Sequence, residues 1–489
     1  MNRNIIKALL CSALAVPVLT SCELDQYPDT YIPTEQSWQT LKDAENYNNG
    51  ILASIRGISY GAGSVGEVQT DLFNLRNTAI DLYQVHTWTF TNTQFDGDGL
   101  WSGSYNVISN ANNVINNIDK VKVETEAERQ LLNKYKANAI FARAFAYANM
   151  VPFYCENYDE SKEQLGLPII KTVDVNRKPK RSSLKETYEF IISDLTEARK
   201  LYADKEDMDY TSPNYNVAEA LQARVLLNMG KNKEAVDTVN DLLTRYSLIT
   251  NKTDYQNMWQ NDVADPGKEI LLELQMTPDD RAGFYGYYES WNQSTQTYNP
   301  SYIPTKGLLD LYERSDYRRA MFFTKGTIEA LDQVADGYVL NKFPGNEALR
   351  KSNDGERIFY NMPKAFRVSE LYLIAAEATN KLNGGGADYL SVLRQARGLQ
   401  ATTVTGDALM SLVKDEWARE YVGEGQRFIC LKRWNAGFTR MKAQSFSANI
   451  LSNQTGAQGL EIKPDNRRFL WEIPAQDLQA NPNLERNWK

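Results

Sequence analysis

The sequence predicts a mostly α-helical protein, in which a helical scaffold carries one long, irregular, loop-rich insertion. Two observations lead to this prediction. Apolar residues recur at intervals of three and four through much of residues 36–246 and 366–436, which is the period of helices with one buried face. Between these two segments, residues 247–365 break into short runs separated by Pro, Gly and Asn, which are typical of turns and loops.

The first 21 residues have the pattern of a secretory signal. Arg3 and Lys7 give a basic start, and the apolar run ALLCSALAVPVL that follows is too short to cross a bilayer. The run ends in LTSC, Leu19–Cys22, which matches a bacterial lipobox. We therefore expect cleavage before Cys22, acylation of its thiol, and a single domain over residues 22–489 that is tethered to a membrane by lipid.

The helical segments follow one another along the chain, and one adjacent pair has a recognisable layout. Residues 216–230 and 231–246 form two helical stripes joined at MGKNK, with small Ala220 and Ala223 where helices pack closely. This is the layout of a tetratricopeptide unit, although the full consensus is absent. In chain order, the predicted helices cover residues 101–119, 135–151, 183–201, 216–230, 231–246, 366–382, 387–399 and 407–425.

Composition excludes several classes of function. The net charge of −8 argues against nucleic acid as a partner, because nucleic-acid binding needs a basic patch. With His86 as its one histidine, the chain has no HExxH motif and no second imidazole for a catalytic relay, and it has no phosphate-binding glycine loop. Cys155 and Cys430 are too few for a disulfide framework, although the two thiols could pair. We expect no cofactor and no enzyme activity.

The insertion contains a segment rich in aromatic rings, FYGYYESWNQSTQTYNPSYIPT, at residues 284–305. Its rings follow neither the helical nor the strand period, so the segment is predicted to be a loop. A sugar ring stacks its apolar face on indole or phenol, while its hydroxyl edge binds amide side chains. The predicted stacking residues here are Trp291, Tyr287, Tyr285 and Tyr298, and the predicted polar partners are Asn292, Gln293 and Gln296.

A second loop, residues 81–99, adds Trp88 as a further stacking candidate. The same loop contains FDGDG, where Asp96 and Asp98 alternate with glycines. These two carboxylates could bind calcium, but the short segment lacks the remaining ligands of a known calcium loop. An alternative role for the rings of residues 281–302 is a small satellite core beneath the insertion.

Several segments are informative when they are taken together in chain order. They are WSGSYNVISNANNVINNI (101–118), FARAFAYANMVPFY (141–154), LPII (167–170), RSSLKETYEFIISDL (181–195), FRVSELYLIAAEA (366–378), EYVGEGQRFICLKRW (420–434) and FLWEIPAQDLQANPNLERN (469–487). In this order they resemble the SusD/RagB family of cell-surface lipoproteins. Two departures lie in the scaffold helices, where Cys430 replaces a frequent acidic residue and Trp417 a frequent basic one.

The resemblance implies a protein of the outer membrane that faces the cell exterior and passes captured glycans to a SusC-like TonB-dependent transporter. It also implies that tetratricopeptide-like helix pairs contact the transporter and that loops on the opposite face hold the ligand. The family has no fixed binding motif, so the residues above are chosen by their chemistry. Two alternatives stay open: capture of peptides by similar loops, and a surface glycoside hydrolase, whose paired carboxylates carry no sequence spacing.

Overall fold

The computed structural model describes residues 37–93, 98–174, 176–281, 287–446, 449–452 and 459–488. The predicted signal segment and Cys22 lie outside these residues, as do Tyr285 and Asp96. The structure is mostly α-helical, which confirms the predicted fold class. None of the helices in the described ranges combines the length and the apolarity that crossing a membrane requires.

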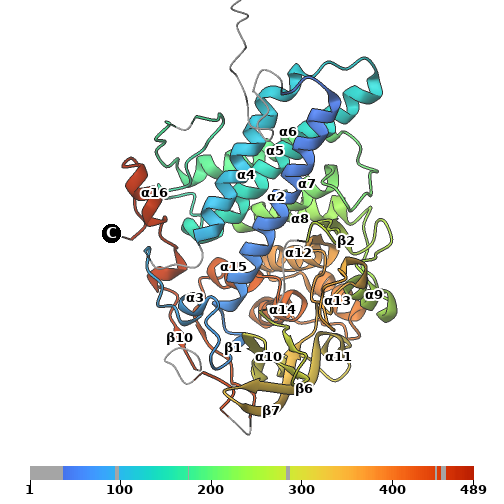
Figure 1. Cartoon of the computed structure of the whole chain (residues 1–489), viewed down its shortest axis with the longest axis vertical. Helices are drawn as coiled ribbons and strands as arrows, with labels where there is room; N and C mark the ends of the chain where they lie inside the picture. The colour runs from blue at the N-terminus through green and yellow to red at the C-terminus, as the bar shows by residue number, and fades with distance from the viewer. Residues whose placement is uncertain are drawn as a thin grey trace, which may run out of the picture.

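Four long helices fill the upper half of the molecule in Figure 1: α2 (Leu41–Val68), α4 (Asp98–Asn117), α5 (Glu126–Tyr154) and α6 (Leu184–Tyr202). Helix α5 is central and packs against the other three. Its alanine-rich stretch is buried, because small side chains let neighbouring helices approach closely. Capping boxes at Thr125 and Ser183 satisfy the first amides of α5 and α6.

The predicted pair at 216–246 is present as α7 (Tyr215–Asn228) and α8 (Asn232–Leu242), which pack on each other and on α12 (Val368–Asn383). Helices α13 (Ala387–Ala396), α14 (Gly406–Tyr421) and α15 (Gln426–Arg433) complete the scaffold. Near its C-terminal end, α2 approaches the turn before α15 so closely that a Cβ on Gly66 would lie 2.4 Å from the carbonyl oxygen of Gly425.

The insertion has more regular structure than its Pro, Gly and Asn content suggests. Strands β6 (Phe323–Ala330) and β7 (Gln333–Leu340) form a long antiparallel hairpin at the lower end of the molecule (Figure 1). With β3 (Trp291–Asn292) and β4 (Thr297–Tyr298), they make a sheet in the order β3-β4-β6-β7. Leu331 and Asp332 at the hairpin turn both have positive φ, the conformation that matches the twist of paired strands.

Shorter segments connect these parts. Strand β2 (Ile270–Glu273) pairs with β8 (Lys364–Arg367), and β1 (Phe73–Leu75) pairs with β5 (Tyr302–Pro304). The remaining segments are α3 (Tyr83–Thr87), η1 (Ile118–Lys120), α9 (Lys252–Gln260), α10 (Lys306–Asp310), α11 (Arg318–Phe322), η2 (Glu347–Leu349), β9 (Phe438–Thr439), β10 (Glu461–Ile462), η3 (Arg467–Phe469) and α16 (Ala475–Ala480).

A buried ion network ties the insertion to the C-terminal helices. The carboxylate of Glu420 accepts hydrogen bonds from Arg318 at 2.8 Å, Arg367 at 2.6 Å and Arg397 at 3.1 Å, and all four side chains are fully buried. Burial alone would raise the pKa of Glu420, but the three guanidinium groups hold it well below its usual value. Removing one member of such a network leaves an uncompensated buried charge, which is strongly destabilising.

The two cysteines whose pairing the sequence left open, Cys155 and Cys430, are free and buried. Burial raises the pKa of each thiol to about 11. Both therefore stay protonated near neutral pH, and a protonated thiol is a poor nucleophile.

Candidate functional site

The aromatic segment of the insertion folds as a short hairpin that brings two predicted site residues together. Strands β3 and β4 pair so that Trp291 lies opposite Tyr298 and Asn292 lies opposite Thr297. Directly opposed side chains project from the same face of a sheet, and the rings of Trp291 and Tyr298 meet edge to face with centroids 4.9 Å apart. The Trp291 ring is half-buried, whereas Tyr298 is only 7% exposed.

A single carboxylate on the neighbouring strand β6 holds this hairpin in place. Glu329 accepts hydrogen bonds from Asn292 at 2.7 Å, Thr295 at 2.7 Å and Thr297 at 2.6 Å. These bonds, with that from Thr297 the strongest, lower the pKa of Glu329. The amide nitrogen of Asn292 is thus engaged within the protein, so this predicted sugar partner serves first to position the hairpin.

Arg357 completes the site, and nothing in the sequence analysis pointed to it. Its guanidinium carbon lies 3.8 Å from the centre of the Trp291 ring, and its Nη1 donates a hydrogen bond of 2.6 Å to the Tyr298 hydroxyl. The face of the indole that we expected to be open is therefore covered by a cation. Because Arg357 is exposed, the surface that meets solvent here is a guanidinium stacked on an indole.

The predicted amide partners lie beside this stack. Gln293 and Gln296 are both exposed at the hairpin tip. The Gln296 amide donates to the backbone oxygen of Gln293 at 2.9 Å and to Glu356 at 3.0 Å. These contacts bring the hairpin tip and residues 355–357 together, so that rings, amides and a guanidinium share one surface.

Other rings of the aromatic segment belong to the core, as the satellite-core alternative proposed. Tyr288 is buried, and its ring centroid lies 4.9 Å from that of Phe73. Tyr287 is half-buried and packs on the same cluster, near Tyr302. Tyr287 therefore lies at the border between core and surface, and Tyr285 lies outside the described residues.

Trp88 requires a correction, because the structure makes it a core residue. Its side chain is 3% exposed, and its indole nitrogen donates a hydrogen bond of 2.6 Å to the backbone oxygen of Gln69. The rings of Phe428, Phe438 and Phe469 surround it. A ring enclosed in this way has no free face for a sugar, so the prediction that Trp88 stacks on ligand is wrong.

The structure does not test the calcium candidates. Asp96 is outside the described residues, and Asp98 begins α4 without a described side chain. Elsewhere in the described ranges, no three or more His, Cys, Asp and Glu side chains gather closely enough to hold a metal ion.

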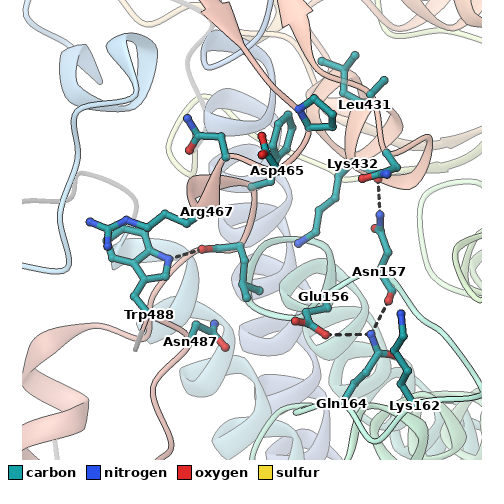
Figure 2. A pocket seen from close by; sticks show the side chains of 16 residues that line it. Glu156, Asn157, Lys162, Gln164, Leu431, Lys432, Asp465, Arg467, Asn487 and Trp488 are labelled. Atoms are coloured by element: carbon teal, nitrogen blue, oxygen red, sulfur yellow. Dashed lines mark hydrogen bonds between the residues drawn. The ribbon is translucent and has the colours of Figure 1, made fainter.

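A separate cavity of about 550 Å³ lies between the end of α5, helix α15 and the C-terminal segment. Figure 2 shows Arg467 and Trp488 on one side of it and Glu156, Asn157 and Gln164 on the other. None of the predicted site residues lines this cavity.

Several groups around this cavity already have partners within the fold. The Lys432 ammonium donates to the backbone oxygens of Pro152 and Cys155, at 2.6 and 2.5 Å, and so caps the C-terminal end of α5. Burial lowers the pKa of Lys432 to about 7. The indole nitrogen of Trp488 donates to the backbone oxygen of Leu470. These groups therefore stabilise chain ends and turns. The surface formed by Trp291, Tyr298, Arg357 and the two exposed glutamines remains the stronger candidate for the binding site.

A helical scaffold that presents rings, amides and a guanidinium on a surface hairpin has the composition of a binding protein. Two family models match the chain, one described as the SusD family over residues 324–489 and one described as starch-binding associating with outer membrane over residues 24–227. Together the two models match residues 24–227 and 324–489, so the chain is similar to SusD-family proteins along most of its length. At the level of the family, this match supports carbohydrate binding and association with the outer membrane.

Known relatives match along nearly the whole chain. SusD-like protein P2 of Formosa agariphila is 23% identical, over 96% of each chain. A solved structure of a putative sugar binding protein from Bacteroides vulgatus has a TM-score of 0.76 at 25% identity and covers 92% of this chain and 99% of that chain. Surface glycan-binding protein A from Bacteroides fluxus shares the fold, with a TM-score of 0.68 at 18% identity over 92% and 99% of the two chains.

Proposed function

We propose that this protein is a non-catalytic, cell-surface lipoprotein that binds glycans and delivers them to a SusC-like TonB-dependent outer-membrane transporter. The observation that carries the proposal is the surface made by Trp291, Tyr298, Arg357 and the exposed Gln293 and Gln296, in a chain of a carbohydrate-binding family. The remaining features of the proposal, the lipid anchor at Cys22, the exterior orientation and the transporter, follow from the lipobox and the family resemblance.

The chemistry of this surface suits a sugar. The guanidinium of Arg357 is held on Trp291 by stacking and by its hydrogen bond to Tyr298, and the apolar face of a pyranose can pack beside it against the half-buried indole. The amides of Gln293 and Gln296 can then bind hydroxyl groups at the edge of the sugar. One such stack contributes on the order of 1 kcal/mol, which places the affinity in the micromolar to millimolar range.

Isothermal titration calorimetry with a panel of plant, host and microbial oligosaccharides tests the binding. Trp291→Ala is expected to weaken the binding of the recognised glycan by about tenfold, because it removes the ring and the seat of Arg357. Tyr389→Ala is the matched control, since Tyr389 is a half-buried ring on scaffold helix α13. Circular dichroism confirms that both variants are folded.

The outcomes of this titration separate the alternatives. The proposal is supported if a glycan gives binding heat with the wild-type chain, if Trp291→Ala reduces this heat and if Tyr389→Ala preserves it. Heat with peptides alone would replace glycans by peptides as the ligand. Release of shorter products from any oligosaccharide would show that the protein is a hydrolase.

The anchor and the transporter need separate tests. Metabolic labelling with a fatty acid should mark the wild-type chain and not a Cys22→Ser variant, and protease treatment of intact cells should degrade only an exterior domain. Affinity purification from outer membranes is expected to recover a TonB-dependent transporter with the wild-type chain. Labelling of Cys22→Ser equal to that of wild type would exclude the lipobox assignment.

A further inference from the structure

Arg357 differs from its neighbouring arginines because no acidic side chain among the described residues pairs with it. Arg281 forms an ion pair of 2.5 Å with Asp354, and Arg350 forms one of 2.5 Å with Glu347. Within the described part of the chain, no carboxylate lies within ion-pair distance of Arg357, although its side chain is exposed. This guanidinium therefore presents an uncompensated positive charge at the candidate site.

The protein holds this charge in a defined orientation. The guanidinium stacks on the Trp291 ring, with 3.8 Å between the guanidinium carbon and the ring centre, and the Tyr298 hydroxyl accepts one of its hydrogen bonds. A guanidinium has five N–H donors in a planar fork, and its other donors have no acceptor among the residues that the structure describes. A planar fork of this kind matches the two oxygens of a carboxylate.

The acidic groups near the hairpin do not neutralise Arg357. The Glu329 carboxylate is occupied by its three hydrogen bonds from the hairpin. Glu356 accepts from Gln296 and forms no ion pair with Arg357. Glu289 is 1% exposed; burial raises its pKa well above the usual value, although Arg357 acts to lower it, and the two side chains form no ion pair.

We propose that this surface selects acidic glycans, with the carboxylate of a uronic acid bound by Arg357 and the sugar ring resting against Trp291. This inference rests on the proposed function, because it assigns the class of glycan to the same site. The exposed amides of Gln293 and Gln296 lie beside Arg357 and bind the hydroxyl groups of the same or the next sugar. A sulfate ester shares the negative charge but is tetrahedral, so a sulfated oligosaccharide is the comparison that distinguishes the two anions.

The net charge of the chain, −8, works against this selection at long range. At physiological ionic strength, however, the Debye length is about 8 Å, so that contacts within the site outweigh the distant charges. The affinity for an acidic glycan should therefore fall as salt is added, whereas the affinity for a neutral glycan of the same length should not.

Calorimetry on the full chain in detergent tests the inference with oligogalacturonate and oligomannuronate, each compared with its carboxyl-reduced, neutral form. The wild-type chain is expected to bind at least one of the acidic forms about tenfold more tightly than its neutral form, a difference of about 1.4 kcal/mol. Arg357→Gln should abolish this preference, so that the acidic and neutral forms bind with equal affinity. Arg350→Gln is the matched control, because that arginine lies on the same segment but is already paired with Glu347.

Each outcome has a definite meaning. Equal affinities for the acidic and neutral forms, or a preference that survives in Arg357→Gln, would overturn the inference. If neutral glycans of the wider panel bind while neither uronate is preferred, the inference fails and the proposed function stands. If no glycan binds, the proposed function itself fails. A sulfated oligosaccharide that binds more tightly than both uronates would overturn the assignment of a carboxylate.

Discussion

Glu377 on α12 is a fully buried carboxylate on which four side chains converge. It accepts two hydrogen bonds from Arg433, at 2.9 and 2.8 Å, and one from Lys381 at 2.8 Å. The indole nitrogens of Trp417 and Trp434 donate to it at 3.1 and 3.0 Å. Trp417 thus supplies a neutral donor to the same acid.

The variant Glu377→Gln keeps the shape of this side chain and removes its charge, which leaves Arg433 buried without a counter-ion. We expect a loss of about 3–5 kcal/mol in the free energy of unfolding. For a chain of 489 residues, the unfolding entropy is about 1 kcal/mol/K at ~2.1 cal/mol/K per residue. The midpoint of thermal unfolding should therefore fall by about 3–5 °C.

The pH dependence gives a second signature. Burial would raise the pKa of Glu377, but Arg433 outweighs burial and lowers this pKa from 4.5 to about 2. A depressed folded-state pKa contributes stability that is present above pH 4.5 and is lost as the pH falls towards 2. The difference in unfolding free energy between wild type and Glu377→Gln should therefore narrow across that window.

Urea unfolding followed by tryptophan fluorescence, at pH 7 and at pH 3.5, measures both effects. Lys381→Gln is the control, because Lys381 donates to the same carboxylate from a partly exposed position and should cost no more than about 1 kcal/mol. A Glu377→Gln protein within about 1 kcal/mol of wild type at pH 7 would refute the reasoning, and so would a cost that does not decrease at pH 3.5.

Three further predictions follow from the packing of the scaffold. Trp88→Ala should lower the free energy of unfolding by about 3–5 kcal/mol in urea titrations, while the folded protein keeps its glycan affinity. Loss of glycan affinity in folded Trp88→Ala protein would show that Trp88 contributes to the binding site. Gly66→Ala should lower the free energy of unfolding by about 1–3 kcal/mol, because its Cβ would lie 2.4 Å from a backbone oxygen. Gly57→Ala on the same helix is the control and should not destabilise the protein, because its Cβ meets nothing within 4 Å. Similar thermal midpoints for the two variants would contradict the close approach. Cys155 and Cys430, with thiol pKa values raised to about 11 by burial, should resist iodoacetamide at pH 8 until urea unfolds the chain, and mass spectrometry of native protein with both sites labelled would contradict this.

The sequence predicts the helical scaffold well because the signal for an amphipathic helix is local. The period of three and four that identifies residues 135–151 lies within the part of α5 that is buried in the structure. Trp88 shows the limit of local patterns, since the rings that enclose it, Phe428, Phe438 and Phe469, lie more than 300 residues later in the chain. No sequence period or motif indicates contacts between such distant residues.

The candidate site is predictable in part for the same reason. Rings among amides predict a recognition segment over residues 281–302, and Trp291 and Tyr298 do meet within it. Arg357, however, lies in an unremarkable DGERIFY stretch and reaches Trp291 only because the chain folds back across the hairpin. The indole face of Trp291 is covered by a cation because of that contact between distant segments.

The attachment of the hairpin through Glu329 has an evolutionary consequence. The exposed tip, residues 293–296, is bonded to Glu329 through Thr295 and to Glu356 through Gln296. The buried charges around Glu377 and Glu420 that hold the scaffold lie in other parts of the chain. Substitutions at the tip therefore change the free energy of unfolding little, since substitutions at exposed positions usually change it by no more than about 0.5 kcal/mol. After gene duplication, substitutions at this tip can change which nutrient is bound without passing through unstable intermediates.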